Sequence, residues 1–255
     1  MNFTDTHTHL YLKHFNKDLS QVMQRTFDAG VNRVLLPNIN SSTVSDLLSL
    51  EERYPNQCFP MMGLHPCYVS KNVEEEVSLV KNWHNKKKFI AVGEIGLDFY
   101  HDTSFAEEQK WAFKEQLVLA KKLNLPVSIH CRESFNEIIN CFDELNFQKI
   151  KGVFHCFTGS ANEAKKIIEY GLKLGVGGVL TFKNSALAKN IRAVKLGDLV
   201  LETDSPYLTP EPFRGKRNES SYIQLIAKKL AEIFNRSTGD VSRETEKNVK
   251  LVFGI

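Results

Sequence analysis

The sequence has no long apolar run. No window approaches the about 18 consecutive apolar residues that a membrane-spanning helix needs. The first residues, MNFTDTHTHL, have no basic region followed by an apolar stretch, which is the pattern of a secretory signal. We therefore expect a cytoplasmic protein that makes no contact with a membrane.

Cysteine is scarce and is not arranged in pairs. The chain has five cysteines, an odd number, and no two of them form a CxxC spacing. This excludes a disulfide-framework protein and favours a reducing compartment in which the thiols are buried as small apolar groups. The GxSxG turn of serine hydrolases is also absent, so a serine nucleophile has little support.

An excess of one charge is missing as well. The chain has 33 Lys and Arg against 30 Asp and Glu, for a net charge of +3. This is too small to indicate a nucleic-acid-binding protein by bulk electrostatics, so any basic groups that contact nucleic acid must be local. Hydrophobic residues make up 42% of the 255 residues, a composition typical of a globular protein with a full core.

The chain does show a regular alternation of short apolar runs and longer segments with helical periodicity. We expect eight strands: Asn2–Thr8, Arg33–Ile39, Cys58–Leu64, Phe89–Ile95, Pro126–Cys131, Gly152–Phe157, Lys173–Val179 and Leu199–Thr203. We expect helices at Leu19–Ala29, Ser42–Tyr54, Glu74–Lys87, Phe105–Leu123, Ser134–Leu145, Ala161–Tyr170, Ser185–Val194, Tyr222–Asn235 and Arg243–Val252.

This alternation implies parallel strands with right-handed crossovers. The expected fold is α/β, a (β/α)8 TIM-type barrel that forms one domain over residues 1–255. The main rival is an open doubly wound sheet, whose nucleotide-binding form has a glycine-rich turn after its first strand. Here the first strand ends in His-Thr-His, and the cluster Gly175, Gly177 and Gly178 indicates close packing in a late strand.

Histidines and acids recur at the ends of the predicted strands. In a (β/α)8 barrel these ends converge on one mouth, where such enzymes carry their active sites. Imidazoles beside carboxylates suit a divalent metal, and six ligands are too many for one tetrahedral ion. We therefore expect two metal ions, with Glu94 as the bridging carboxylate. The six candidate ligands are His7, His9, Glu94, His130, His155 and Asp204.

Contacts with the substrate are predicted around the same mouth. His65 follows the third strand and either contacts the substrate or is a structural histidine. Arg132 lies two residues after His130, and Arg214 to Arg217 bring three cations to the loop after the eighth strand, where barrels often bind phosphate. The alternatives are a salt bridge at the rim for Arg132 and a solvated basic loop for the segment that contains Arg214 and Arg217.

Five segments that contain these residues occur in a characteristic order and run over nearly the whole chain. They are Asp5–His9 (DTHTH), Gly93–Asp98 (GEIGLD), Pro126–Arg132 (PVSIHCR), His155–Gly159 (HCFTG) and Glu202–Leu208 (ETDSPYL). Together they resemble the TatD family of metal-dependent deoxyribonucleases, which are amidohydrolase-like barrels. Four positions depart from the family's pattern without coinciding with a proposed ligand: Thr4, Tyr11, Asn136 and Ser220.

The resemblance implies two divalent metal ions, with Mg²⁺ as the usual activating ion. It implies hydrolysis of DNA, commonly from a 3′ end, with single-stranded DNA or 3′ ends as the expected substrate. No obligate protein partner is evident in the sequence. Some relatives act on aminoacylated tRNA, so the family alone does not fix the substrate. One ion would be held by His7, His9 and Asp204 and the other by His130 and His155, with Glu94 between them.

The leading hypothesis is two-metal hydrolysis of a phosphodiester, in which Asp204 binds one metal, orients the attacking water and accepts its proton. The same centre could instead hydrolyse an amide, a lactone or an ester. A third alternative is a metal-stabilised scaffold without catalysis. The sequence does not decide the identity of the metal, since histidine nitrogen favours Zn²⁺ or Mn²⁺ whereas carboxylate and water suit Mg²⁺.

Overall fold

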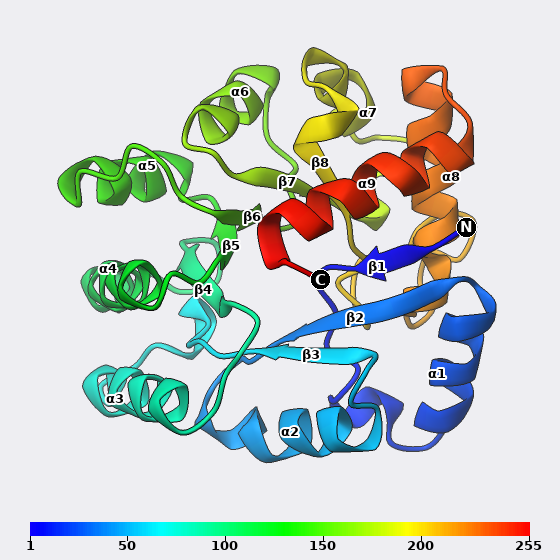
Figure 1. Ribbon diagram of the computed structural model, residues 1–255. Helices are drawn as coiled ribbons and strands as arrows, with labels where there is room; N and C mark the ends of the chain where they lie inside the picture. Colours follow the sequence, from blue (N-terminus) through cyan, green and yellow to red (C-terminus); the bar gives the residue numbers. More distant parts are fainter.

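The computed structural model describes all 255 residues, as eight parallel strands that alternate with helices (Figure 1). The strands are β1 (Phe3–Asp5), β2 (Val31–Pro37), β3 (Cys58–Met61), β4 (Val92–Asp98), β5 (Val127–Arg132), β6 (Gly152–Phe154), β7 (Lys173–Val176) and β8 (Leu199–Leu201). They form two hydrogen-bonded groups in chain order, β1–β3 and β4–β8.

Backbone hydrogen bonds join the two groups at both seams. The Met62 N–H donates to Ala91 O at 3.2 Å, beside β3 and β4, and the Thr6 N–H donates to Leu201 O at 3.0 Å, beside β1 and β8. The parallel α/β architecture predicted from the alternating sequence is thereby confirmed. It brings the residues that follow the first and last strands next to each other.

Nine α-helices lie outside the strands and along one end (Figure 1), and none of them combines the length and apolar character needed to cross a membrane. They are α1 (Leu19–Asp28), α2 (Val44–Arg53), α3 (Val73–Lys86), α4 (Ala106–Leu123), α5 (Phe135–Glu144), α6 (Ala161–Glu169), α7 (Leu187–Asn190), α8 (Ile223–Phe234) and α9 (Thr238–Phe253). The last helix begins five residues before the predicted start because Ser237 and Asp240 form a capping box at its N-terminus.

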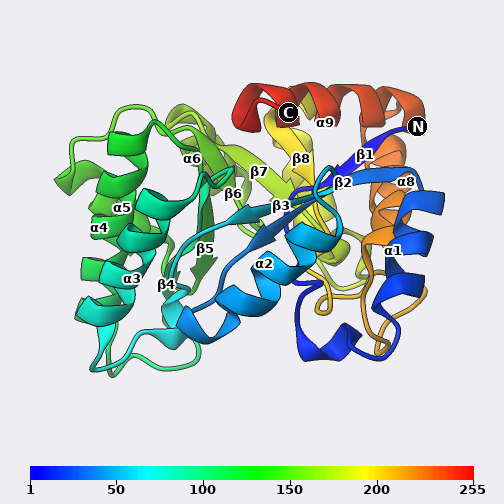
Figure 2. The same cartoon turned by 60° about the horizontal axis from the view of Figure 1, so that its bottom comes forward.

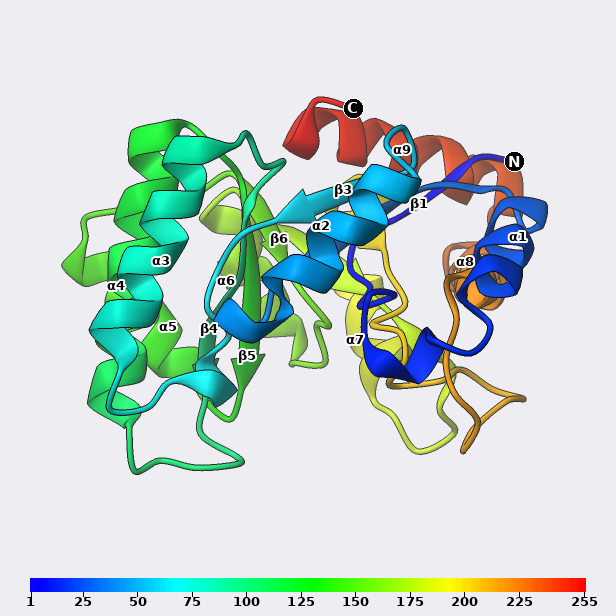
Figure 3. The ribbon, with the colours of Figure 1, turned by 90° about the horizontal axis from the view of Figure 1, so that it is seen from below.

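Helix α9 closes one end of the strand assembly (Figures 2 and 3). Its Val249, Val252 and Phe253 pack with inward side chains of the strands, among them Leu35 and Val200, in an apolar cluster separate from the main core. The main core fills the space between strands and helices. Because α9 seals this end with apolar groups, polar groups that must reach solvent can do so at the opposite end, where the long loops lie.

Six strands, β1, β2, β3, β6, β7 and β8, end two or three residues earlier than predicted, and at β1 and β6 this changes the setting of the candidate ligands. β1 ends at Asp5, so His7 and His9 lie beyond it, and β6 ends at Phe154, so His155 follows the strand instead of lying within it. The reason at β6 is that Cys156 adopts a left-handed backbone, with φ of 46°. β7 ends at Val176 because the chain then turns into a 3-10 helix at Gly178, where a Cβ atom would lie 1.9 Å from Leu208 O.

Candidate metal centre

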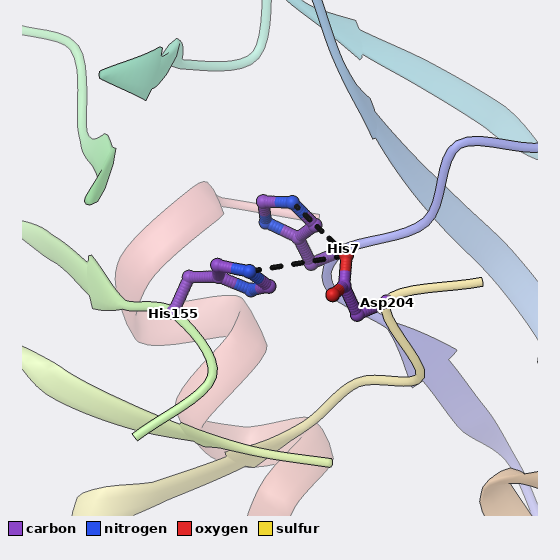
Figure 4. A group of neighbouring side chains, drawn as sticks. All are labelled: His7, His155 and Asp204. Atoms are coloured by element: carbon purple, nitrogen blue, oxygen red, sulfur yellow. Dashed lines mark ion pairs between the residues drawn. The ribbon is translucent and has the colours of Figure 1, made fainter. Parts of the chain in front are cut away.

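The six predicted ligands converge at the open end of the strands. Five of them line one cavity of about 860 Å³, and His7 lies buried directly beneath it. Figure 4 shows His7, His155 and Asp204 approaching one another from three separate segments of the chain. The rings of His7 and His155 stack with their centroids 3.4 Å apart. Residues far apart in the sequence therefore form one cluster, as the barrel prediction required.

Glu94 lies at the centre of this cluster, and its two oxygens face different histidines. Its Oε2 lies 3.1 Å from His7 Nε2 and 3.7 Å from His9 Nε2. Its Oε1 lies 2.9 Å from His130 Nδ1 and 3.8 Å from His155 Nε2. Burial raises the pKa of Glu94, but the surrounding imidazoles hold it well below its ordinary value, so the group stays ionised.

Asp204 completes the cluster from the loop after β8. Its Oδ1 lies 3.5 Å from His9 Nε2 and 3.9 Å from the Nε2 atoms of both His7 and His155. The residue has a left-handed backbone, with φ of 56°, and its N–H donates to His7 O at 2.9 Å. Its side chain is 15% exposed whereas that of Glu94 is 2% exposed. Of the two acids, Asp204 is therefore the one that solvent reaches.

The two histidines of the DTHTH segment are oriented by hydrogen bonds on their far sides. His7 Nδ1 lies 3.1 Å from Ser128 Oγ. His9 Nδ1 lies 3.0 Å from the hydroxyl oxygen of Tyr11, which itself donates to Pro37 O at 2.5 Å. Since that hydroxyl proton is already used, His9 must donate from Nδ1, and its Nε2 is left with a free lone pair toward Glu94 and Asp204. Tyr11, one of the departures from the family's pattern, thus fixes the tautomer of His9.

Replacing Tyr11 with phenylalanine should weaken metal binding through His9. The change removes the acceptor of the Nδ1 proton and leaves the ring packing intact, and loss of such an outer partner typically costs about 10–100-fold in metal affinity. Competition with a chromophoric chelator would measure this loss. Tyr54→Phe is a matched control, since this ring packs against Phe27 and its hydroxyl contacts none of the candidate ligands. Equal affinity in Tyr11→Phe and the parent chain would contradict this role.

Behind His155 lies a second carboxylate, Glu202, which the sequence prediction did not include. Its Oε1 lies 3.0 Å from His155 Nδ1 and accepts from the Cys156 N–H at 2.6 Å. Burial lowers the pKa of His155, but Glu202 and the other acids raise it to about 10. Only two buried polar side-chain atoms in the chain lack a hydrogen bond, and they belong to this pair: His155 Nδ1 and Glu202 Oε2.

Gly175 makes the room that Glu202 occupies. A Cβ atom at position 175 would lie 2.1 Å from Glu202 Oε2. The close packing predicted for this glycine cluster is therefore confirmed. The missing side chain at Gly175 leaves space for the buried Glu202 carboxylate behind His155. A carboxylate in this position raises the basicity of a coordinating imidazole.

Glu202→Gln should lower metal affinity by about 10–100-fold while the apo chain stays folded. The amide keeps the shape of the side chain but removes the charge that favours a basic His155. Gly175→Ala should act in the same direction by displacing the carboxylate. Isothermal titration with Zn²⁺ and a thermal melt of the apo chain check both points. A stable variant with parental metal affinity would show that Glu202 has no such role.

His65 and Asp98 add contacts to the same cluster. His65 Nδ1 accepts from the Cys67 N–H at 3.1 Å, so its proton lies on Nε2, which is 3.3 Å from Glu94 Oε1. Asp98 Oδ2 lies 2.9 Å from His130 Nε2. His65 lines the cavity, where the sequence predicted a substrate contact, and it also touches Glu94. Asp98 belongs to the GEIGLD segment, but nothing in the spacing of that segment indicated its contact with His130.

The two cysteines next to candidate ligands differ in how they compare with the prediction. The alternation of side chains along a strand predicted that Cys131 and Cys156 point outward, away from the histidines beside them. Cys131 agrees with this prediction, since its Sγ lies 3.6 Å from Ser134 Oγ and the residue packs against the core between strands and helices. Cys156 does not, because its side chain lies in a group of donor atoms with His155 and Glu202 and lines the cavity. At Cys156 the left-handed turn removes the strand alternation on which that prediction depended.

The three predicted phosphate contacts are distributed unequally. Arg132 lines the cavity, with its guanidinium 3.7 Å from the centre of the Tyr100 ring. Arg214 lies over Phe182 at 3.7 Å and is outside the cavity lining. Arg217 is also outside it and binds both oxygens of Asp18, at 2.8 and 2.7 Å. The structure therefore brings only Arg132 to the metal ligands.

Arg217 should contribute to stability in a way that depends on pH. Its hydrogen bonds lower the pKa of Asp18 below the ordinary 3.8. Burial raises the pKa of Glu219, but Arg25 and Arg217 lower it below 4.5. Such a contribution is present above these values and is lost as the pH falls through the lowered pKa values. Arg217→Gln should cost about 2–4 °C in Tm at pH 7 and progressively less below pH 4. A Tm difference that is constant from pH 7 to 3 would contradict this.

The donor set fits divalent cations. Three carboxylates line the cavity, from Glu94, Asp98 and Asp204, against the single cation Arg132. Five groups of donor atoms lie close enough to hold an ion. Three contain only histidine and acid: His7 with His9 and Glu94, His7 with His155 and Asp204, and His65 with Glu94 and His130. The other two contain a cysteine: Cys67 with Asp98 and His101, and His155 with Cys156 and Glu202. Three carboxylates against one guanidinium attract cations and disfavour phosphate, so an anionic substrate would need the metal cations in order to bind.

The chain is similar to proteins of one family. Residues 4–254 match the family model described as TatD related DNase. A protein of Bacillus subtilis (strain 168), named as the uncharacterized metal-dependent hydrolase YabD, is 34% identical over 98% of both chains. The 3′-5′ ssDNA/RNA exonuclease TatD of Erwinia tasmaniensis is 30% identical over 94% of this chain and 95% of its own.

A solved structure extends the comparison to the fold. The crystal structure of YjjV, a TatD homologue from Escherichia coli K12, superposes with a TM-score of 0.93 at 30% identity, over 99% of this chain and 98% of that chain. The family match covers all six candidate ligands, and the relatives share nearly the full length of the chain. The chain is therefore a metal-dependent hydrolase that belongs to the TatD-related DNase family.

Proposed function

We propose that this protein hydrolyses phosphodiester bonds of single-stranded DNA, from a 3′ end, with two divalent metal ions. The observation that carries the proposal is the position of Glu94, whose two oxygens face two different sets of imidazoles. One ion would be held by His7, His9 and Asp204 and the other by His130 and His155, with Glu94 bridging. The imidazole donors favour Zn²⁺ or Mn²⁺, and Mg²⁺ is the activating ion that the family suggests.

When bound, the ions would supply a water that ionises near neutral pH and would polarise the phosphoryl oxygens. The residues of the chain have distinct tasks around them. Asp204, the more exposed acid, orients the attacking water and accepts its proton. Glu94, buried and ionised, keeps the two sets of ligands at a fixed separation. Arg132, held against Tyr100, binds a phosphate oxygen of the substrate.

Two further observations bear on the substrate and on where the protein acts. The relative from Erwinia tasmaniensis is named as an exonuclease of single-stranded DNA and RNA, which supports a nucleic acid as the substrate. All five cysteines are free, which supports a reducing compartment and hence action in the cytoplasm.

The test uses the chain stripped with a chelator and reloaded separately with Mg²⁺, Mn²⁺ or Zn²⁺. Oligonucleotides labelled at the 3′ or the 5′ end report the bond cleaved and the direction of cleavage. An RNA oligonucleotide, an aminoacyl-tRNA, a lactone and an N-acyl amino acid form the comparison panel. We expect metal-dependent release of nucleotides from the 3′ end of DNA. Turnover confined to the lactone, the amide or the aminoacyl ester would overturn the proposal.

A further inference from the structure

Three tyrosines stand exposed around the open end of the strands. Tyr68 is 48% exposed, Tyr100 56% and Tyr207 47%, and they are three of only seven large apolar side chains in the chain that are exposed. They follow β3, β4 and β8, on loops at the end that carries the metal ligands. None of their hydroxyl groups forms a hydrogen bond within the chain. Exposed rings gathered at one site mark a surface for a partner with flat, apolar faces.

Two of these rings border the cavity itself. Tyr68 and Tyr207 both line it. The Tyr68 ring centre lies 6.0 Å from that of His65, and the Tyr207 ring centre lies 6.2 Å from that of His9, in both cases edge to face. Each tyrosine therefore rests on a histidine of the metal cluster. A group bound between the rings would lie next to a bond being hydrolysed at the centre.

The charges of the cavity favour recognition of a nucleic acid through its bases over recognition through its phosphate backbone. Proteins that bind nucleic acid mainly through phosphate use several Lys and Arg. Here Arg132 is the one Lys or Arg among the lining residues, and Arg217 is already paired with Asp18. Beyond the scissile phosphate at the metal ions, a strand bound at this site must therefore gain affinity elsewhere. Stacking of bases on aromatic rings is the general alternative, since every base has a π-face.

We propose that Tyr68 and Tyr207 form a clamp that stacks unpaired nucleobases beside the scissile phosphodiester, with Arg132 on Tyr100 as the one Lys or Arg that contacts phosphate at the rim. This inference rests on the proposed function and names the part of the substrate that the protein recognises. It makes the substrate a strand with free base faces. Duplex DNA, whose bases stack on each other, and a strand without bases are poor ligands.

The clamp is tested by binding. Fluorescence anisotropy measures the Kd of the metal-loaded chain for a labelled phosphorothioate oligonucleotide, which resists hydrolysis, and for an abasic strand of equal length and charge. The parent chain should prefer the base-bearing strand. Tyr68→Leu and Tyr207→Leu should each weaken binding of that strand by about ten-fold and leave the abasic strand unaffected. Tyr68→Phe and Tyr207→Phe should retain the preference, because phenylalanine still stacks.

Trp111→Leu is the matched control. Trp111 is an exposed aromatic residue of α4 that does not line the cavity, so its loss should not alter the preference for bases. A parent chain that binds both strands equally, or leucine variants that keep the preference, would overturn the clamp even where hydrolysis of DNA is observed. Base-dependent binding without hydrolysis of any oligonucleotide would support the clamp and overturn only the proposed reaction.

Salt dependence gives a second readout. Each phosphate neutralised by a Lys or Arg on a single strand contributes a slope of about −0.7 to a plot of log association constant against log salt concentration. With one phosphate at the lining arginine and the scissile phosphate at the metal ions, the slope should lie between about −0.7 and −1.4. A slope steeper than about −3 would show that backbone cations hold the strand and would contradict the clamp.

Discussion

Replacing Glu94 with glutamine is expected to lower kcat for the oligonucleotide by at least about a thousand-fold. The amide has the same shape, but it carries no charge and presents only one good ligand oxygen. The two sets of imidazoles that face Oε1 and Oε2 would then lose the group between them. Steady-state hydrolysis at saturating metal and substrate measures the effect.

Glu137→Gln is the control for this variant. Glu137 lines a separate cavity next to the mouth and forms no hydrogen bond with the metal cluster. The control should hydrolyse DNA at the parental rate. If Glu94→Gln hydrolysed DNA at the parental rate, the reaction would not depend on a bridged pair of ions.

Replacing Asp204 with asparagine should lower kcat by about 10²–10⁴-fold, the usual contribution of a positioned base. Asparagine tolerates the left-handed backbone at this position, so the fold should be retained. It can still place an oxygen among His7, His9 and His155, but it cannot accept the proton of the attacking water. We therefore expect a larger loss of turnover than of bound metal.

Metal content and kcat measured on the same preparation separate these effects. An Asp204→Asn chain that loses all metal together with its activity would make Asp204 a ligand without a role as base. A chain that keeps its metal and its parental kcat would remove Asp204 from the mechanism. Circular dichroism of the variant provides the check on folding.

The architecture and the gathering of the ligands could be predicted because they depend on pattern and topology. Strands alternating with helices specify a parallel barrel, and parallel strands carry their C-terminal ends to one face. His7, Glu94 and Asp204, which are separated by most of the chain, therefore had to meet. The prediction needed only the approximate ends of strands, and shifts of a few residues at β1 and β6 did not alter it.

The partners behind the ligands could not be predicted because they depend on side-chain direction within turns. Tyr11 lies two residues from His9, yet only the structure shows its hydroxyl on Nδ1. Glu202 stands beside the candidate ligand Asp204 in the ETDSPYL segment, but its carboxylate faces His155, which lies on a different strand end. Cys156 faced the cavity against prediction for a similar reason, because a single positive φ reverses the alternation of a strand.

The partner of the Arg217 guanidinium also could not be predicted from the sequence. A cation next to a glycine on the last strand loop is equally suited to phosphate and to an acid of the same protein. The acids in question, Asp18 and Glu219, include one that lies almost two hundred residues away in the sequence. Its proximity follows from the closeness of the first and last strands, and no local motif indicates it.

The central claim is that the cluster around Glu94 holds two metal ions. Elemental analysis of the chain after loading with Zn²⁺ or Mn²⁺ and exhaustive dialysis tests it most directly, together with anomalous diffraction from crystals of the loaded protein. We predict two ions per chain, one on each side of Glu94. A single ion, or two ions of which neither contacts Glu94, would contradict the claim.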